Sequence, residues 1–97
     1  MNELKIPDAA LADEKSFEIL RVWAAFKQQH VVIHSGLNGG PEDFGFLLAE
    51  LAFHGSKLYA EKLNQSEAIT LKEILAGFDK EIIDSSGEPS GGIERQD

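Results

Sequence analysis

The chain has 97 residues, of which 42% are hydrophobic and 27% are charged, an ordinary composition for a globular protein. Seventeen acidic residues outnumber nine basic ones, for a formal net charge of −8, so we expect no nucleic-acid partner and no anionic membrane. The absence of cysteine excludes disulfides and thiolate metal sites. Because there is neither an apolar stretch of about 20 residues nor the charge pattern of a signal peptide, a cytoplasmic location is expected.

Two elements are predicted before residue 29. Residues Glu3–Ile6 alternate polar and apolar side chains, which indicates a short strand. Asp13 is a suitable N-cap for a helix that begins at Glu14, because its carboxylate can accept a hydrogen bond from a free backbone N–H. At about 100° per residue, the large apolar side chains of this helix share one side. They are Ile19, Leu20, Trp23 and Phe26.

A strand is predicted over Gln29–Ser35, where the period changes to two and Val31, Val32 and Ile33 are all β-branched. Its backbone groups need a partner, since buried unpaired donors and acceptors are costly. Two partners remain open. One is Glu3–Ile6, joined through the first helix as a parallel βαβ unit, and the other is the same strand of a second subunit.

Two further helices follow a glycine-rich turn. Pro41 at a first helical position predicts a long helix that ends near Leu63, with Asn64 suited to the left-handed conformation after its end. The segment Thr70–Glu73 fits a capping box for a third helix, whose apolar pattern ends at Asp84.

Together these elements predict an α+β fold in which three helices pack with a short two-stranded sheet, in the order β-α-β-α-α. We expect residues 1–84 to form a single compact domain. Residues 85–97 contain one large apolar residue and are predicted to be a disordered tail, because they bury too little surface to offset the entropy of ordering.

The histidines are the first candidates for a binding site. His30 and His34 share a strand face, but at about 3.3 Å per residue they lie too far apart to chelate one ion easily. His54 follows Glu50 by one helical turn, a spacing at which both side chains can reach one metal ion. We therefore take His54 and Glu50 as the candidate metal ligands, although no third ligand is evident.

Catalytic machinery is not evident. Ser35, Ser56 and Ser66 lack the GxSxG context of a nucleophilic serine, and no acid/base pair stands out. We expect no catalytic residue and no cofactor, and the sequence favours a non-enzymatic binding or assembly module over an enzyme. The alternative is a small-ligand or metal-binding domain built around His54.

Several short segments of the sequence resemble those of a small bacterial family known only as domain of unknown function 5076. They are Ile6-Pro7, Leu20-Arg21-Val22-Trp23-Ala24-Ala25, Gln29-His30-Val31, Pro41 with Phe44-Gly45, Leu51-Ala52 with His54, and Gly77-Phe78-Asp79 with Glu81. The resemblance implies a compact α/β domain without an established activity. It also draws attention to Arg21, His30 and His54, which are polar residues within otherwise apolar segments. With Tyr59, these residues are the ligand-binding candidates.

The long helix carries a second apolar side. Phe46 and Phe53 lie opposite its leucine-rich stripe, so either the third helix or another subunit is needed to cover them. We expect a homodimer or another protein partner. Phe46, Phe53 and His34, on an exposed strand face, are the interface candidates.

Overall fold

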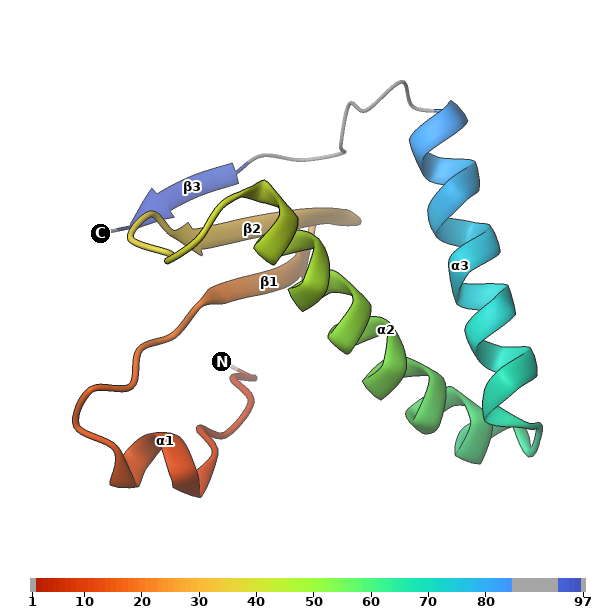
Figure 1. Ribbon diagram of the computed structural model, residues 1–97, viewed down its shortest axis with the longest axis horizontal. Coiled ribbons are helices and arrows are strands. Elements are labelled where there is room, and N and C mark those ends of the chain that lie inside the picture. Colours follow the sequence, from red (N-terminus) through yellow and green to blue (C-terminus); the bar gives the residue numbers. More distant parts are fainter. Residues whose placement is uncertain (1, 85–92, 97) are drawn as a thin grey trace. The chain divides into compact units, whose positions relative to one another are not determined.

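The computed structural model describes residues 2–84 and 93–96 and confirms the predicted α+β class, with helices and a short sheet (Figure 1). The elements follow one another as α1 (Asp8–Ala12), β1 (Leu20–Ala25), β2 (Gln28–His34), α2 (Pro41–Leu63), α3 (Glu67–Asp84) and β3 (Ile93–Gln96). The chain divides into two compact units, a sheet unit that runs to Leu37 and includes β3, and a helical unit that begins at Asn38. The single domain over residues 1–84 stays a prediction.

The helix predicted from Glu14 is wrong, because its apolar half forms strand β1. This strand pairs antiparallel with β2, in a register that runs from Leu20 opposite Ile33 to Ala25 opposite Gln28. Asp13 ends α1, and its Oδ1 accepts a hydrogen bond from the backbone N–H of Lys15 at 2.9 Å. The carboxylate therefore stabilises a turn instead of starting a helix.

A two-residue turn, Phe26–Lys27, joins β1 to β2. Both residues have positive φ, 53° for Phe26 and 61° for Lys27, as a type I′ hairpin turn requires. Glycine and asparagine usually occupy these positions, because a side chain with a Cβ is strained there. The pairing places Arg21 and Trp23 on one face of the hairpin. Their neighbours across the strands on that same face are Val32 and His30, respectively.

The predicted strand Glu3–Ile6 is not formed. Leu4 and Ile6 remain exposed, so their alternation reflects no sheet face. Both predicted partners of the Gln29–Ser35 strand are wrong: Glu3–Ile6 forms no strand, and the same strand of a second subunit would need a free edge. The predicted Gln29–Ser35 strand corresponds to β2, the middle strand of the order β1-β2-β3, and both of its edges are occupied within the chain.

Strand β3 comes from the segment that was predicted to be a tail. Ile93–Gln96 pair parallel with β2, in a register from Val31 with Ile93 to His34 with Gln96. Strand pairing uses backbone groups that nearly every residue carries, so a polar segment can form an edge strand without an apolar pattern. The rest of the predicted tail, residues 85–92 and 97, lies outside the described residues.

The predicted long helix is confirmed as α2. At its start, the Asp43 carboxylate accepts a hydrogen bond from the backbone N–H of Gly40 at 2.9 Å. Gly39 has a φ of 84°, and a Cβ there would clash with this carboxylate. At the other end, Asn64 takes the left-handed conformation, with φ 55° and ψ 52°, as expected. Short polar side chains and glycine thus set both ends of α2.

Helix α3 begins four residues earlier than the capping-box motif predicts, at Glu67 instead of Leu71. Ser66 caps it, because its Oγ accepts a hydrogen bond from the N–H of Ile69 at 3.1 Å. Thr70 lies one turn inside the helix and is buried, and its hydroxyl donates to the Ser66 carbonyl at 2.8 Å. The predicted end at Asp84 is confirmed.

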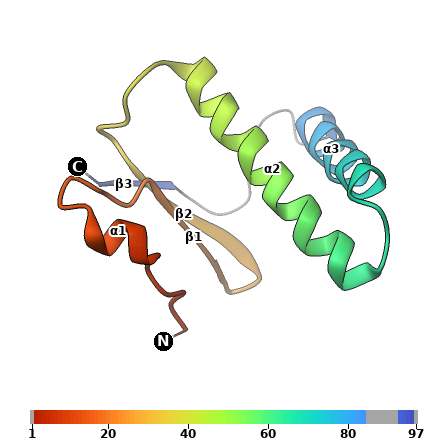
Figure 2. The same cartoon turned by 60° about the horizontal axis from the view of Figure 1, so that its bottom comes forward.

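The two long helices form an antiparallel hairpin joined by a short connection, as both views show (Figures 1 and 2). Three small side chains near the connection are buried between them: Ser56, Ala60 and Thr70. Among the described residues these are the buried ones, with 4%, 6% and 2% exposure respectively. Within residues 2–84 and 93–96, no helix is long and apolar enough to cross a membrane.

Candidate functional site

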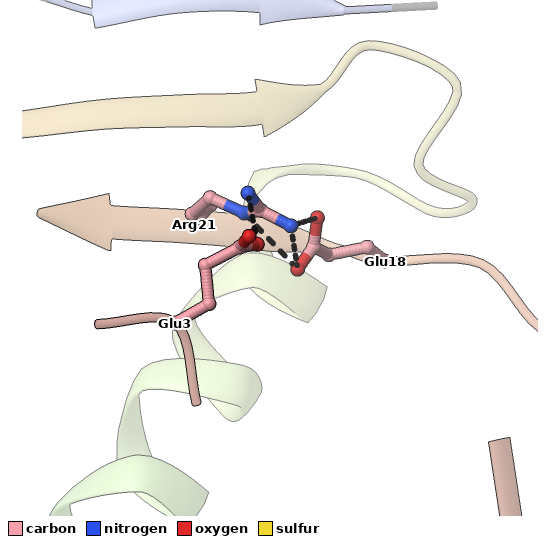
Figure 3. Close-up of polar contacts among 3 residues, drawn as sticks. All are labelled: Glu3, Glu18 and Arg21. Atoms are coloured by element: carbon pink, nitrogen blue, oxygen red, sulfur yellow. Dashed lines mark hydrogen bonds and ion pairs between the residues drawn. The ribbon is translucent and has the colours of Figure 1, made fainter. Parts of the chain in front are cut away.

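Arg21 lies between two carboxylates at the edge of the sheet unit (Figure 3). Its Nη1 donates to Oε2 of Glu3 at 3.0 Å, and its Nη2 lies 3.1 Å from Oε1 of Glu18. The hydrogen bond and charge of Glu18, with a smaller contribution from Glu3, raise the pKa of Arg21 above its ordinary value. The guanidinium is therefore neutralised within the chain and tethers the N-terminal segment to β1, which disfavours a second anion as its ligand.

His34 ends β2 in a mixed aromatic and polar setting. Its ring lies 4.7 Å from the ring of Phe17, tilted by 45°, and its Nδ1 accepts a hydrogen bond from the N–H of Gly36 at 3.0 Å. Because Nδ1 is an acceptor, a neutral His34 carries its proton on Nε2. A cleft of about 490 Å³ adjoins the ring. It is lined by Phe17, Glu18, Ile19, Leu20, Arg21, Val32 and His34.

A hydrogen bond within the hairpin holds the ring of His30 near the turn. Its Nε2 lies 3.0 Å from the carbonyl oxygen of Ala25, and because a carbonyl only accepts, Nε2 must be the donor. The ring is half-buried beside Trp23, its partner across the hairpin. One of the two ring nitrogens, Nε2, is therefore engaged in a hydrogen bond within the hairpin.

His54 and Glu50 line one groove of about 480 Å³ in the helical unit. The groove lies between α2 and the first turns of α3, and Lys57 and Glu67 also line it. Neither His54 nor Glu50 is buried. Among the described residues, no three histidine, aspartate or glutamate side chains come together as a metal site. The groove thus offers two ligands from α2, in a solvated setting.

Titration with Zn²⁺ tests this pair. We expect weak binding that the His54→Ala variant loses, because two side chains supply only half of the four ligands that zinc usually takes. Isothermal titration calorimetry on the metal-free protein measures it. His30→Ala is the matched control, since it removes an imidazole from the other unit. Micromolar affinity that survives His54→Ala would place the metal elsewhere.

The four predicted ligand-binding residues fall in two units. Arg21 and His30 belong to the hairpin, whereas His54 and Tyr59 lie on α2, so a site that joins all four stays a prediction. Sequence reasoning did not identify the groups that surround Arg21 and His34. Glu3, Phe17 and Glu18 lie in segments without a strand or helix, and only Glu18, three residues before Arg21, stands at a spacing from which a contact could have been predicted.

The predicted interface residues Phe46 and Phe53 lie on α2 and are 59% and 48% exposed. Phe53 shares the His54 groove with Leu71 of α3, so both residues lie on one side of the helical hairpin. His34, the third interface candidate, is half-buried against Phe17. The role of all three in an interface stays a prediction.

Comparison with known proteins gives a family and a fold. Residues 3–85 match the family described as Domain of unknown function (DUF5076). No curated protein matches the chain. A solved structure from the photosynthetic bacterium Rhodopseudomonas palustrus CGA009, provisionally described as a pyruvate dehydrogenase, is similar with a TM-score of 0.69 and 23% identity. The similarity covers 84% of this chain and 94% of that one, and at this identity it shows the fold alone.

Proposed function

The chain belongs to the family described as Domain of unknown function (DUF5076), and we propose that it is a non-enzymatic assembly module that acts as a homodimer. The family description names no activity. We place this bacterial module in the cytoplasm, without a nucleic-acid or membrane partner. Its acidic surface, with a net charge of −8, supports that choice because it repels phosphate groups.

One observation carries the proposal. The helical hairpin has an apolar surface that its own two helices do not cover, which we name the α2–α3 apolar face. It consists of Phe46, Phe53, Leu71, Leu75, Phe78 and Ile82. All except the half-buried Leu71 are exposed, and the side chains buried between the helices are small.

The size of this face fits a protein partner. An aromatic side chain buries about 150–250 Å², so three phenylalanines at half exposure leave roughly 300 Å² of ring surface in water. With the aliphatic members, the face approaches the several hundred square ångströms that mark an interaction site. A stable dimer buries about 800 Å² on each partner, so the face could supply most of the apolar centre of such an interface.

The alternative function, a small-ligand or metal site around His54, is supported by the groove that His54 shares with Glu50. Both side chains are exposed there, and an exposed pair of ligands holds a small ligand weakly. The apolar face extends along both helices, whereas the groove offers only two ligands, so assembly is the function that we favour.

A charged substitution on the face tests the proposal. We expect the wild-type chain to be a dimer and Phe53→Glu to be a folded monomer, because the new carboxylate would lose its hydration in the interface. Light scattering coupled to size exclusion gives the mass, and circular dichroism reports the fold. Ile83→Glu is the matched control, since Ile83 is 74% exposed on α3 and lies away from the face.

Three results would overturn the proposal. A wild-type monomer that unfolds on Phe53→Glu would place Phe53 in an intramolecular core. A wild-type monomer that tolerates the change would leave the face without a partner copy. A dimer that persists in Phe53→Glu would show that the copies associate through another surface.

A further inference from the structure

Helix α3 carries an apolar stripe at coiled-coil spacing. Leu71, Leu75, Phe78 and Ile82 follow one another at intervals of four, three and four residues. This spacing keeps side chains along one seam between helices that pack at a shallow angle. Leu75, Phe78 and Ile82 are 47%, 50% and 55% exposed, so the greater part of the seam is open.

Helix α2 does not fill this seam. It meets α3 through Thr70, which is buried, and near Ile74, whose Cδ1 would lie 3.7 Å from a Cβ added at Gly55. At about 100° per residue, Thr70 and Ile74 lie roughly 90° around α3 from the centre of the stripe. In a four-helix bundle, each helix contacts two neighbours at such an angle. The stripe is therefore placed to receive a further helix beside α2.

Two opposite charges flank the stripe on the side away from α2. Lys72 and Asp79 are seven residues apart, so they occupy equivalent positions along the same edge. Two turns of helix, about 10 Å, separate their Cα atoms, which is too far for an ion pair within one helix. Among the described residues, neither side chain has a salt bridge or a side-chain hydrogen bond.

We propose that α3 pairs antiparallel with α3 of a second copy, an arrangement that rests on the proposed homodimer. Leu75 of each copy packs against Phe78 of the other, and Leu71 against Ile82. Lys72 of each copy then faces Asp79 of the other, because equivalent edge positions meet in an antiparallel pair. The two-fold axis makes the contact self-complementary, with two identical ion pairs.

The antiparallel direction follows from the same residues. In a parallel pair, Asp79 would face Ile74 of the second copy in place of Lys72, so neither Lys72–Asp79 ion pair would form. An antiparallel pair also places both α2 helices on one side of the α3 pair. Phe46 and Phe53 of the two copies then lie toward each other, and the four helices close into a bundle.

Charge reversal on the full chain tests the arrangement. Lys72→Glu and Asp79→Lys each place two like-charged pairs in the dimer, and we expect each to weaken association about tenfold or more at low salt. Mixed in equal amounts, the two variants restore both ion pairs in a heterodimer. The double variant, which carries both changes, restores them in a homodimer. Sedimentation equilibrium gives the affinities, and native mass spectrometry identifies the heterodimer.

Lys80→Glu is the matched control, because it makes the same charge change on the other side of α3 and should leave association unchanged relative to Lys72→Glu. A wild-type dimer that neither charge reversal weakens would overturn this arrangement and leave the homodimer intact. The same holds for variants that weaken association but do not recover it when mixed. A wild-type monomer would overturn both proposals.

Discussion

Replacing Phe26 and Lys27 with asparagine and glycine is expected to raise the free energy of unfolding by about 1–3 kcal/mol. Both residues adopt the left-handed conformation of the hairpin turn, where a Cβ lies too close to the backbone. Glycine removes this strain, and asparagine tolerates the conformation well. Little packing is lost, because Phe26 is 94% exposed. Urea unfolding followed by circular dichroism measures the change.

The control for this experiment is Lys27→Ala. It removes the long charged side chain but keeps the Cβ, so it should leave most of the strain in place and change stability little. If the asparagine–glycine turn lowers stability instead, then Phe26 or Lys27 makes contacts within the folded chain that outweigh the backbone strain.

The same turn explains why the hairpin was not predicted. Hairpins are recognised in sequences by asparagine–glycine or aspartate–glycine pairs between apolar runs, and Phe26–Lys27 carries no such signal. Without a turn, the spacing of Leu20, Trp23 and Phe26 matched a helix and continued the pattern of the residues before them. In β1, Leu20 and Trp23 lie on opposite faces and the strand gains its hydrogen bonds from β2, a partner that local spacing does not reveal, whereas Phe26 belongs to the turn.

The helices were predicted more accurately because local chemistry determines their ends. Pro41 at the start of α2 and Asn64 after its end act through their own backbone preferences, and both are where the sequence placed them. The start of α3 differs because two capping residues compete. Ser66 reaches the N–H of Ile69, which leaves Thr70 free to be buried against α2. Burial of this kind depends on a second helix and is not local.

The candidate site was predictable only where one helix carries both residues. Helical spacing placed His54 beside Glu50, and the structure has both in one groove. By contrast, Arg21 was predicted as a ligand-binding residue, but Glu3 and Glu18 occupy its guanidinium. Glu3 lies eighteen residues away in an irregular segment, so no spacing rule could join it to Arg21. Contacts through irregular segments depend on the folded path of the chain.

Ala60→Leu is expected to lower the free energy of unfolding by about 1–3 kcal/mol, because the leucine side chain would overpack the narrow contact between α2 and α3. Ala60 is 6% exposed, and the other buried residues of the two helices, Ser56 and Thr70, are also small. A leucine would push the helices apart and strain the Gln65 amide, which donates to the Thr70 hydroxyl at 2.9 Å. Urea unfolding measures the loss.

Ala49→Leu is the matched control. Ala49 lies eleven residues before Ala60, about three helical turns, and therefore faces the same side of α2, but it is exposed. The same substitution there should change stability by no more than about 0.5 kcal/mol. Equal losses at both positions would show that the small-residue side of α2 is covered along its whole length. No loss at Ala60 would show that the two helices move apart easily to accept a larger side chain.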